Sequence, residues 1–257
     1  MSLPQMPSPA DRGTVDVPHP VLTAYYPDEP RRSAFLRRMF DQTASDYDRM
    51  ERLLGLGSGS WYRREALIRA GLQRGMRIAD VGVGTGLVAR EAAAVVGDPR
   101  LVIGIDPSAG MMQQARLPQE IRLVQGTAEA IPLDDSSFDF VSMGFALRHV
   151  SSLSAAFREF RRVLRPGGRV CILEITRPEN RLHYHLLRLY AYRIVPTLAR
   201  LLANDRQTVK MWRYYWETID ACVPPAQVVQ ALGDAGFVDV RRHVVLGMFS
   251  EYQARAA

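Results

Sequence analysis

The stretch Ala79-Asp80-Val81-Gly82-Val83-Gly84-Thr85-Gly86-Leu87 decides the fold of this chain. The largely apolar residues 77–81 have the length of a buried parallel strand, and residues 88–96 have the composition of a helix. A strand, a glycine-rich loop and a helix in this order are typical of doubly wound folds that bind a nucleotide-like cofactor at the carboxyl end of the sheet. Glycines let the backbone approach such a ligand closely, and the start of the helix offers free N–H groups.

The positions of the glycines favour S-adenosylmethionine (SAM) over a dinucleotide. A dinucleotide-binding loop has the pattern G-x-G-x-x-G, and Leu87 stands at the position of its third glycine. The chain instead has Gly82, Gly84 and Gly86, with Asp80 two residues ahead of them. SAM lacks a pyrophosphate and carries an ammonium group, which a carboxylate near the loop can hold directly or through water.

A second acidic residue follows at the distance along the chain that suits a ribose-binding carboxylate. Residues 101–105 are predicted to form the next strand, which leads into Asp106, twenty residues after Gly86. A carboxylate at this place can accept hydrogen bonds from both ribose hydroxyls. The loop with an acid on either side therefore predicts a SAM site.

The alternation of strands and helices continues to the end of the chain. The further expected elements are strands at 121–125, 138–143, 169–175, 237–246 and 248–254 and helices at 153–164 and 225–235. This order predicts a doubly wound, Rossmann-like α/β fold, with a mainly parallel sheet and one antiparallel strand near the C-terminus.

The regions around this core differ from it in composition. Residues 1–30 hold seven of the sixteen prolines, which predicts a flexible or extended leader. Residues 31–257 are expected to form a single domain, with N-terminal helices at 31–75 and a helical cap inserted at 178–222. The segment 40–50, between two expected helices, either covers the cofactor site or packs the helices onto the sheet.

The overall composition, with 47% hydrophobic and 23% charged residues, is that of a soluble globular protein. The net charge of +6 comes from arginines spread along the chain, which favours a solvated basic surface over nucleic-acid binding. Neither the two cysteines, Cys171 and Cys222, nor the five histidines have metal-ligand spacing, so no metal site is expected. No apolar run reaches the roughly 18 residues of a membrane span and no signal-peptide pattern opens the chain, so a cytoplasmic location is expected.

Several motifs resemble those of the class I SAM-dependent methyltransferases. They are the loop 80–86, Asp106, Ala128-Glu129-Ala130-Ile131-Pro132, Ser137-Phe138-Asp139 and Arg162-Val163-Leu164-Arg165-Pro166-Gly167-Gly168. More narrowly, the chain resembles the ubiquinone/menaquinone biosynthesis C-methyltransferase family in residues 40–50, Phe145-Ala146-Leu147-Arg148-His149-Val150, residues 173–178 and residues 195–205.

The motif positions and this resemblance give the expected site and reaction. The expected cofactor-binding residues are Asp80, Gly82, Gly84, Gly86, Asp106, Pro107, Met111, Thr127, Ala128, Glu129 and Phe145. Residues 126–132 are expected where the adenine would lie. The resemblance implies C-methylation of a hydroxylated aromatic or quinone-like small molecule, by in-line transfer from the sulfonium.

Two departures from the family pattern lie on the substrate side. Tyr47 and Met50 match the early signature of the family, but Glu51 replaces an Asn. His149 stands where the family usually has an Asn. These departures do not touch the expected SAM site, and they leave the identity of the methyl acceptor open.

C-methylation needs a base or a cation beside the acceptor, because a ring carbon becomes a good nucleophile when an adjacent hydroxyl loses its proton. Arg148 and His149 follow the fourth expected strand, at the carboxyl edge of the sheet. Arg148 can hold a phenolate or order a water that takes the proton, and His149 can act as the base itself. A helix-cap or packing role is the alternative for His149. The resemblance adds Tyr47 as a third catalytic candidate.

The expected cap, residues 178–222, combines long apolar stripes with arginines such as Arg181 and Arg188. It could line a pocket for an apolar or aromatic acceptor. Its helices would also suit peripheral contact with anionic lipid. Packing onto the core or onto a second subunit, in a homodimer, is the simpler alternative.

Two other functions stay open on the sequence alone. The first is an O- or N-methyltransferase of another small molecule, motivated by the altered positions Glu51, Gly59 and His149; no His stands shortly before Trp61 here, as one does in the family pattern. The second, from a different class, is a non-catalytic or nucleic-acid-directed SAM-binding protein, which would bind RNA in a salt-sensitive way. An NAD-dependent oxidoreductase is disfavoured by Leu87.

Overall fold

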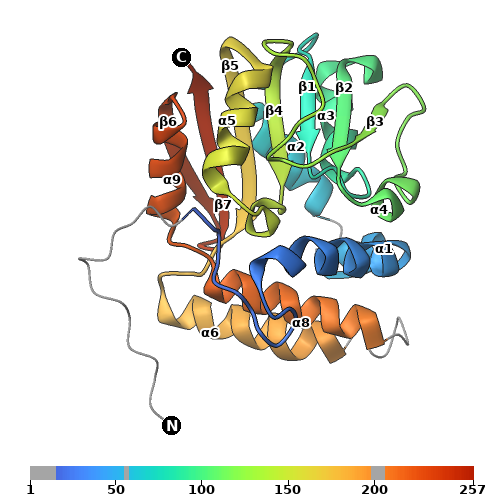
Figure 1. Cartoon of the computed structure of the whole chain (residues 1–257), viewed down its shortest axis with the longest axis vertical. Helices are drawn as coiled ribbons and strands as arrows, with labels where there is room; N and C mark the ends of the chain where they lie inside the picture. Colours follow the sequence, from blue (N-terminus) through green and yellow to red (C-terminus); the bar gives the residue numbers. More distant parts are fainter. Residues whose placement is uncertain (1–15, 55–57, 198–205) are drawn as a thin grey trace.

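The computed structural model describes residues 16–54, 58–197 and 206–257, apart from the side chains of 45–47, 49–54 and 206–208. At its centre is a seven-stranded sheet with the order β3-β2-β1-β4-β5-β7-β6 (Figure 1). The strands are β1 (Ile78–Val81), β2 (Val102–Asp106), β3 (Arg122–Gln125), β4 (Phe138–Gly144), β5 (Leu164–Ile175), β6 (Phe237–Val245) and β7 (Phe249–Ala256). Strands β1 to β5 pair in parallel, and β7 is antiparallel to β5 and β6. The predicted sheet is therefore confirmed.

Helices pack on both faces of this sheet. The helices and short helical turns are α1 (Glu29–Leu54), α2 (Gly59–Arg69), α3 (Leu87–Val96), η1 (Pro99–Leu101), α4 (Ala109–Gln113), η2 (Leu147–His149), α5 (Leu153–Val163), α6 (Arg181–Leu189), η3 (Tyr190–Ile194), α8 (Arg206–Ala221) and α9 (Pro225–Asp234). Phe140 and Cys171 belong to the core cluster of α2 and α3, and Val141 and Ile172 to that of α5 and α9. Neighbouring strand residues alternate between the two clusters because their side chains point to opposite faces.

The strand order places a crevice at the carboxyl end of β1 and β4. From β1 the chain continues to β2 on one side, and it returns at β4 on the other side. The loops after these two strands diverge, and such a switch point is where doubly wound sheets bind their ligands. The glycine loop at 82–86 and the segment at 145–149 meet there.

A further helical layer lies across the carboxyl ends of the strands (Figure 1). In this layer α1 packs against α8, and Leu36 and Met39 form a buried cluster with Met211 and Tyr214. The segment 40–50 is part of α1, so it is a helix and not the connection between helices that was expected. The reason is that Leu36, Phe40 and Ala44 continue one apolar stripe at a spacing of four residues.

The described part of the expected leader, residues 16–28, has no helix or strand and packs against the domain. The backbone carbonyl of Asp16 accepts a hydrogen bond from Leu153 N (2.7 Å), and that of Pro18 accepts one from Val223 N (2.8 Å). His19 and Tyr26 are buried. The His19 ring also lies 2.9 Å, Nε2 to Nη2, from the buried guanidinium of Arg32 on α1. The rest of the leader, residues 1–15, lies outside the described residues.

Candidate functional site

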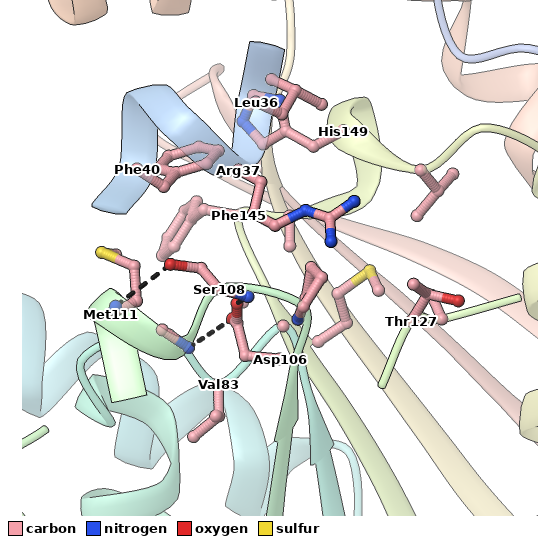
Figure 2. Close-up of a pocket in the computed structure, with 18 of the residues that line it drawn as sticks. Leu36, Arg37, Phe40, Val83, Asp106, Ser108, Met111, Thr127, Phe145 and His149 are labelled. Carbon is pink, nitrogen blue, oxygen red and sulfur yellow. Dashed lines mark hydrogen bonds between the residues drawn. The ribbon is translucent and has the colours of Figure 1, made fainter. Parts of the chain in front are cut away.

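A cavity of about 630 Å³ lies between the carboxyl edge of the sheet and the α1–α8 layer (Figure 2). On the sheet side it is lined by the glycine loop, the end of β2, residues 125–129 and the end of β4. On the other side it is lined by Leu36, Arg37 and Phe40 of α1 and by Tyr215 of α8. Its volume lies within the range that holds a cofactor or a drug-sized ligand.

The glycine loop forms the floor of the cavity. Gly82 has a φ of 73°, and a Cβ there would lie 2.7 Å from the Cβ of Ala146, so only glycine fits. Gly84 also lines the cavity, and its N–H donates to Asp106 Oδ2 (2.8 Å). Gly86 does not line the cavity, contrary to the expectation of ligand contact. It precedes α3 with a φ of 87° and packs against Leu117, so its role is to shape the turn.

Asp106 lies at the end of β2 with its carboxylate in the cavity wall. Oδ1 accepts the N–H of Ser108 (2.8 Å), and Oδ2 accepts that of Gly84. Burial raises the pKa of Asp106 to about 6, although these two hydrogen bonds favour the ionised form. The carboxylate has further lone pairs, so it can accept the ribose hydroxyls of a nucleoside.

Asp80 does not line the cavity, so of the two expected modes, direct contact with the ammonium group and contact through water, the structure does not support the direct one. It is buried beneath the loop, where its Oδ1 accepts the hydroxyl of Ser142 (2.6 Å) and its Oδ2 has no hydrogen-bond partner among the described residues. Burial raises its pKa to about 7. Strand β1 points this side chain to the face of the sheet that α3 covers. Asp80 can therefore act on the ammonium group only by shaping the loop or through a bridging water.

The other expected cofactor-binding residues also lie in the cavity wall, with Met111 and Thr127 on opposite sides of it (Figure 2). Pro107, Met111, Thr127, Ala128 and Glu129 all line it. The carboxylate of Glu129 accepts hydrogen bonds from the backbone N–H (2.5 Å) and the hydroxyl (2.8 Å) of Ser151, the second residue after η2. This contact joins the segment after β3 to the segment after β4 and so closes that side of the wall.

Phe145 lines the cavity in a backbone conformation that is uncommon for its residue type. Its φ is 59°, and its N–H donates to Leu173 O (2.7 Å). A large residue held in the left-handed region costs about 1–3 kcal/mol and is found where the surrounding structure fixes it, often at a functional site. The guanidinium of Arg63 lies 5.5 Å from the ring centroid and holds it from the α2 side.

The imidazole of His149 is in the cavity wall, inside a cluster of aromatic rings. Its ring centroid is 5.3 Å from that of Phe40, 5.8 Å from that of Tyr214 and 5.7 Å from that of Tyr215. Both ring nitrogens are buried, and neither has a hydrogen-bond partner among the described residues.

Burial is the main cause that lowers the pKa of His149 well below its ordinary value, and the charges of Arg148 and Arg32 lower it further. The imidazole is therefore neutral at physiological pH. It can accept or donate a hydrogen bond through its ring nitrogens.

Arg148 is not in the cavity wall, so the structure does not place it to hold a phenolate. Its guanidinium forms a buried ion pair with Glu174 and stacks 4.7 Å from the ring centroid of Tyr215. Its carbonyl accepts a hydrogen bond from Arg32 Nη2 (2.7 Å). The buried carboxylate of Glu174 turns this arginine into the core, where it supports η2 from behind. The side chain of Tyr47, the third catalytic candidate, lies outside the described residues.

Helix α1 contributes cavity residues that the sequence analysis did not single out. Figure 2 shows Arg37 reaching from α1 into the cavity, with Leu36 and Phe40 beside it. Arg37 forms no ion pair with a described residue. The apolar stripe that includes Leu36 and Phe40 is the sequence pattern that points to these cavity residues. It explains why the helix packs, but it does not predict that the Arg37 side chain reaches into the cavity.

Two acidic residues of α1 tie the helix to the cofactor loops. Asp41 Oδ1 accepts the hydroxyl of Ser108 (2.5 Å) and the N–H of Gly110 (2.9 Å) at the start of α4. Asp48 accepts the hydroxyl of Thr85 in the glycine loop. Segment 40–50 thus both covers the site and packs onto the core, which were the two alternatives given by the sequence.

The described residues contain no group of three or more His, Cys, Asp or Glu side chains arranged to hold a metal ion. None of their helices is both long enough and apolar enough to cross a membrane.

Comparison with known proteins identifies relatives over nearly the whole described chain. Residues 29–250 match the model of the ubiE/COQ5 methyltransferase family. A demethylmenaquinone methyltransferase of Roseiflexus castenholzii is 36% identical over 87% of this chain and 93% of its own length. A ubiquinone/menaquinone biosynthesis C-methyltransferase UbiE of Hahella chejuensis is 33% identical over 73% of this chain and 77% of its own length.

Solved structures with the same fold are more distant in sequence. A SAM-dependent methyltransferase of Thermotoga maritima, described as a possible histamine N-methyltransferase, has a TM-score of 0.60 at 20% identity and covers 86% of this chain and all of its own. The phosphoethanolamine N-methyltransferase 2 of Haemonchus contortus, in complex with S-adenosylhomocysteine, has a TM-score of 0.52 at 22% identity. It covers 71% of this chain and 38% of its own.

The fold, the cavity and the comparisons agree on the cofactor. The glycine loop and Asp106 fit a nucleoside that needs close backbone approach and a ribose acceptor, and SAM is such a molecule. The chain belongs to the ubiE/COQ5 methyltransferase family and is a SAM-dependent methyltransferase.

Proposed function

We propose that the enzyme C-methylates a hydroxylated aromatic or quinone-like ring. Relatives named for demethylmenaquinone methylation and for ubiquinone/menaquinone biosynthesis support this acceptor class. The observation that carries the proposal for this chain is the composition of the cavity wall opposite the glycine loop. Leu36, Phe40 and Tyr215 make it apolar and aromatic, and the neutral imidazole of His149 lies among them.

Residues of the sheet edge would hold the cofactor. Asp106 would accept the ribose hydroxyls, Gly82 and Gly84 would let the backbone approach the ligand, and Thr127 to Glu129 would flank the base; all of them line the cavity. When bound, SAM supplies an electrophilic methyl group on its sulfonium. Asp80, beneath the loop, would act on the ammonium group through the loop or a water.

The α1–α8 side would hold the acceptor ring. Phe40 and Tyr215 offer aromatic surface on which a flat ring can stack, and Leu36 adds apolar contact. The side chains of this wall also exclude water, which strengthens electrostatic interactions inside the cavity. An apolar ring therefore gains free energy by leaving water for this place.

His149 is proposed to take the hydroxyl proton of the acceptor. A buried polar group without a partner costs free energy, so the unsatisfied ring nitrogens favour a ligand that supplies a hydrogen bond. Because the lowered pKa makes His149 a weak base, the phenolate needs stabilisation by a cation. Arg37, which reaches into the cavity, is proposed for this role in place of Arg148.

A pair of substitutions at His149 tests this assignment. His149→Phe keeps an aromatic ring and removes both nitrogens, and it should lower kcat/KM for a demethylated quinol by about 10²–10⁴-fold. SAM affinity, measured by titration calorimetry, should stay at the wild-type value because Asp106 and the glycine loop are unchanged. His149→Gln, which can form a hydrogen bond but is a poor base, should recover binding of the acceptor more than kcat. A His149→Phe variant with wild-type kcat/KM would contradict the assignment.

Analysis of the product distinguishes C-methylation from the alternative, O- or N-methylation of another small molecule. Mass spectrometry of the purified product, with fragmentation, shows whether the new methyl group is on a ring carbon or on an oxygen or nitrogen. The relatives named here favour carbon, and no comparison favours the non-catalytic or nucleic-acid-directed alternative.

Because the proposed acceptor is apolar, the cap, residues 178–222, has two proposed contacts: the surface of a membrane, or a second subunit in a homodimer. The two exclude each other on the same surface, because a face buried against a second subunit cannot also touch lipid.

A further inference from the structure

Helix α6 has an outer face of exposed leucines. Leu182, Leu186 and Leu189 recur at i, i+4 and i+7, and they are 64%, 54% and 53% exposed. Arg181 and Arg188 are exposed on the same helix. We call these five residues the α6 face. Single exposed apolar residues are ordinary, but a stripe of large ones along one helix marks an interaction surface.

The side of α6 opposite the exposed leucines makes the contacts that hold the helix on the protein. Leu187 is buried, and the ring of Tyr184 lies 5.9 Å from that of Trp216 on α8. The α6 face is therefore directed away from the protein. It continues into η3, where Tyr192 and Ile194 are also exposed.

The charge of residues 180–204 favours an anionic lipid surface over a second copy of the chain as the partner of the α6 face. Residues 180–204 contain four arginines, two histidines and no aspartate or glutamate. A twofold contact between two copies of the α6 face would place these arginines against each other, and the acid that precedes the helix, Glu179, already pairs with Arg242 (3.5 Å). A helix with leucines flanked by arginines and histidines has instead the pattern of a helix lying in an anionic membrane interface.

We propose that the α6 face docks on an anionic lipid surface. This deepens the proposed function, because it brings the enzyme to the phase in which an apolar, quinone-like acceptor dissolves. The position of α6 suits this role: it packs against α8, whose Tyr215 lines the cavity (Figure 1). The leucines would enter the acyl boundary, and the arginines would lie at the anionic headgroups.

Flotation with lipid vesicles tests the proposal without any acceptor or SAM. The full-length protein should float with phosphatidylglycerol vesicles and should bind phosphatidylcholine vesicles much less, and added salt should weaken the binding. The double variant Leu186→Gln, Leu189→Gln should reduce vesicle binding by about tenfold or more, since it removes two apolar anchors. Ile68→Gln is the matched control, because Ile68 is 47% exposed on α2, outside the α6 face.

The outcomes are distinct. Wild-type protein that stays unbound to phosphatidylglycerol, or a double variant that binds as the wild type does, overturns the proposal. A wild-type dimer in sedimentation velocity that the double variant converts to monomer also overturns it, because the face then serves a second copy.

Activity on a water-soluble, short-chain quinol distinguishes failure of the lipid-docking proposal from failure of the proposed function. The double variant should keep wild-type kcat/KM on that acceptor and lose rate only on a long-chain acceptor embedded in vesicles. A wild-type enzyme with no activity on the soluble acceptor would count against the proposed function and not against the docking surface.

Discussion

The two halves of the cavity are built in different ways. The cofactor half is formed by loops that directly follow β1, β2 and β3, and Asp106 accepts hydrogen bonds from backbone N–H groups in two of these loops. The acceptor half is formed by η2, α1 and α8, and its buried ion pair joins Arg148 to Glu174, 26 residues apart. The first half is thus built mainly from loops that follow neighbouring strands of the sheet, and the second from segments that only the packing of the helical layer brings together.

This difference predicts where the protein tolerates change. A site on loops that directly follow sheet strands keeps most of its shape when one side chain is lost, because the sheet still positions the loops. A site that rests on a buried ion pair loses its support when one partner is removed, because the other charge is left uncompensated. The acceptor half should therefore be the more sensitive to substitutions outside the cavity.

The largest effect is expected from breaking the ion pair behind η2. Glu174→Gln leaves the buried Arg148 guanidinium without its counter-charge and should lower the free energy of unfolding by about 3–5 kcal/mol. Urea denaturation followed by circular dichroism measures this loss. Asp239→Asn is the control: it breaks the exposed pair with Arg255, which should cost about 0–1 kcal/mol. Equal losses in the two variants would show that Glu174 does not support the acceptor half.

A smaller effect, confined to the cofactor half, is expected at Asp106. Asp106→Ala removes the proposed ribose acceptor and should weaken SAM binding by about 1.5–3 kcal/mol, the scale of hydrogen bonds to a charged group. Titration calorimetry gives the affinity directly. Unchanged affinity would remove Asp106 from the ribose role, and an unchanged unfolding curve would show that the backbone alone holds the loops.

The smallest effect is a dependence of SAM affinity on pH. The pKa of Asp106 is about 6, so lowering the pH through this value protonates the carboxylate and weakens its hydrogen bonds. Replacing charged by neutral hydrogen bonds costs about 1 kcal/mol, so affinity should fall about fivefold between pH 7 and pH 5. Asp106→Asn should abolish this dependence near pH 6. A dependence that persists near pH 7 would belong to Asp80, whose pKa is about 7, and a flat wild-type profile would contradict the prediction.

The sequence by itself determined the cofactor half. The glycine spacing, Asp106 and the alternation of strands and helices all act over short distances along the chain, so the strand–loop–helix unit could be predicted from local pattern. The same local logic gave Thr127, Ala128 and Glu129, because the carboxyl ends of neighbouring parallel strands meet at one edge. It could not distinguish Gly86 and Asp80, which support the loop, from Gly82 and Gly84, which line the cavity.

The tertiary structure alone decided the acceptor half. Whether Arg148 faces the cavity depends on Glu174, and its carbonyl is held by Arg32, 116 residues earlier in the chain. The aromatic cluster around His149 brings Phe40 together with Tyr214 and Tyr215 of a helix far along the chain. Such contacts have no period or spacing in the sequence. They follow from how the helical layer packs across the sheet, and that packing determines which side chains meet the acceptor.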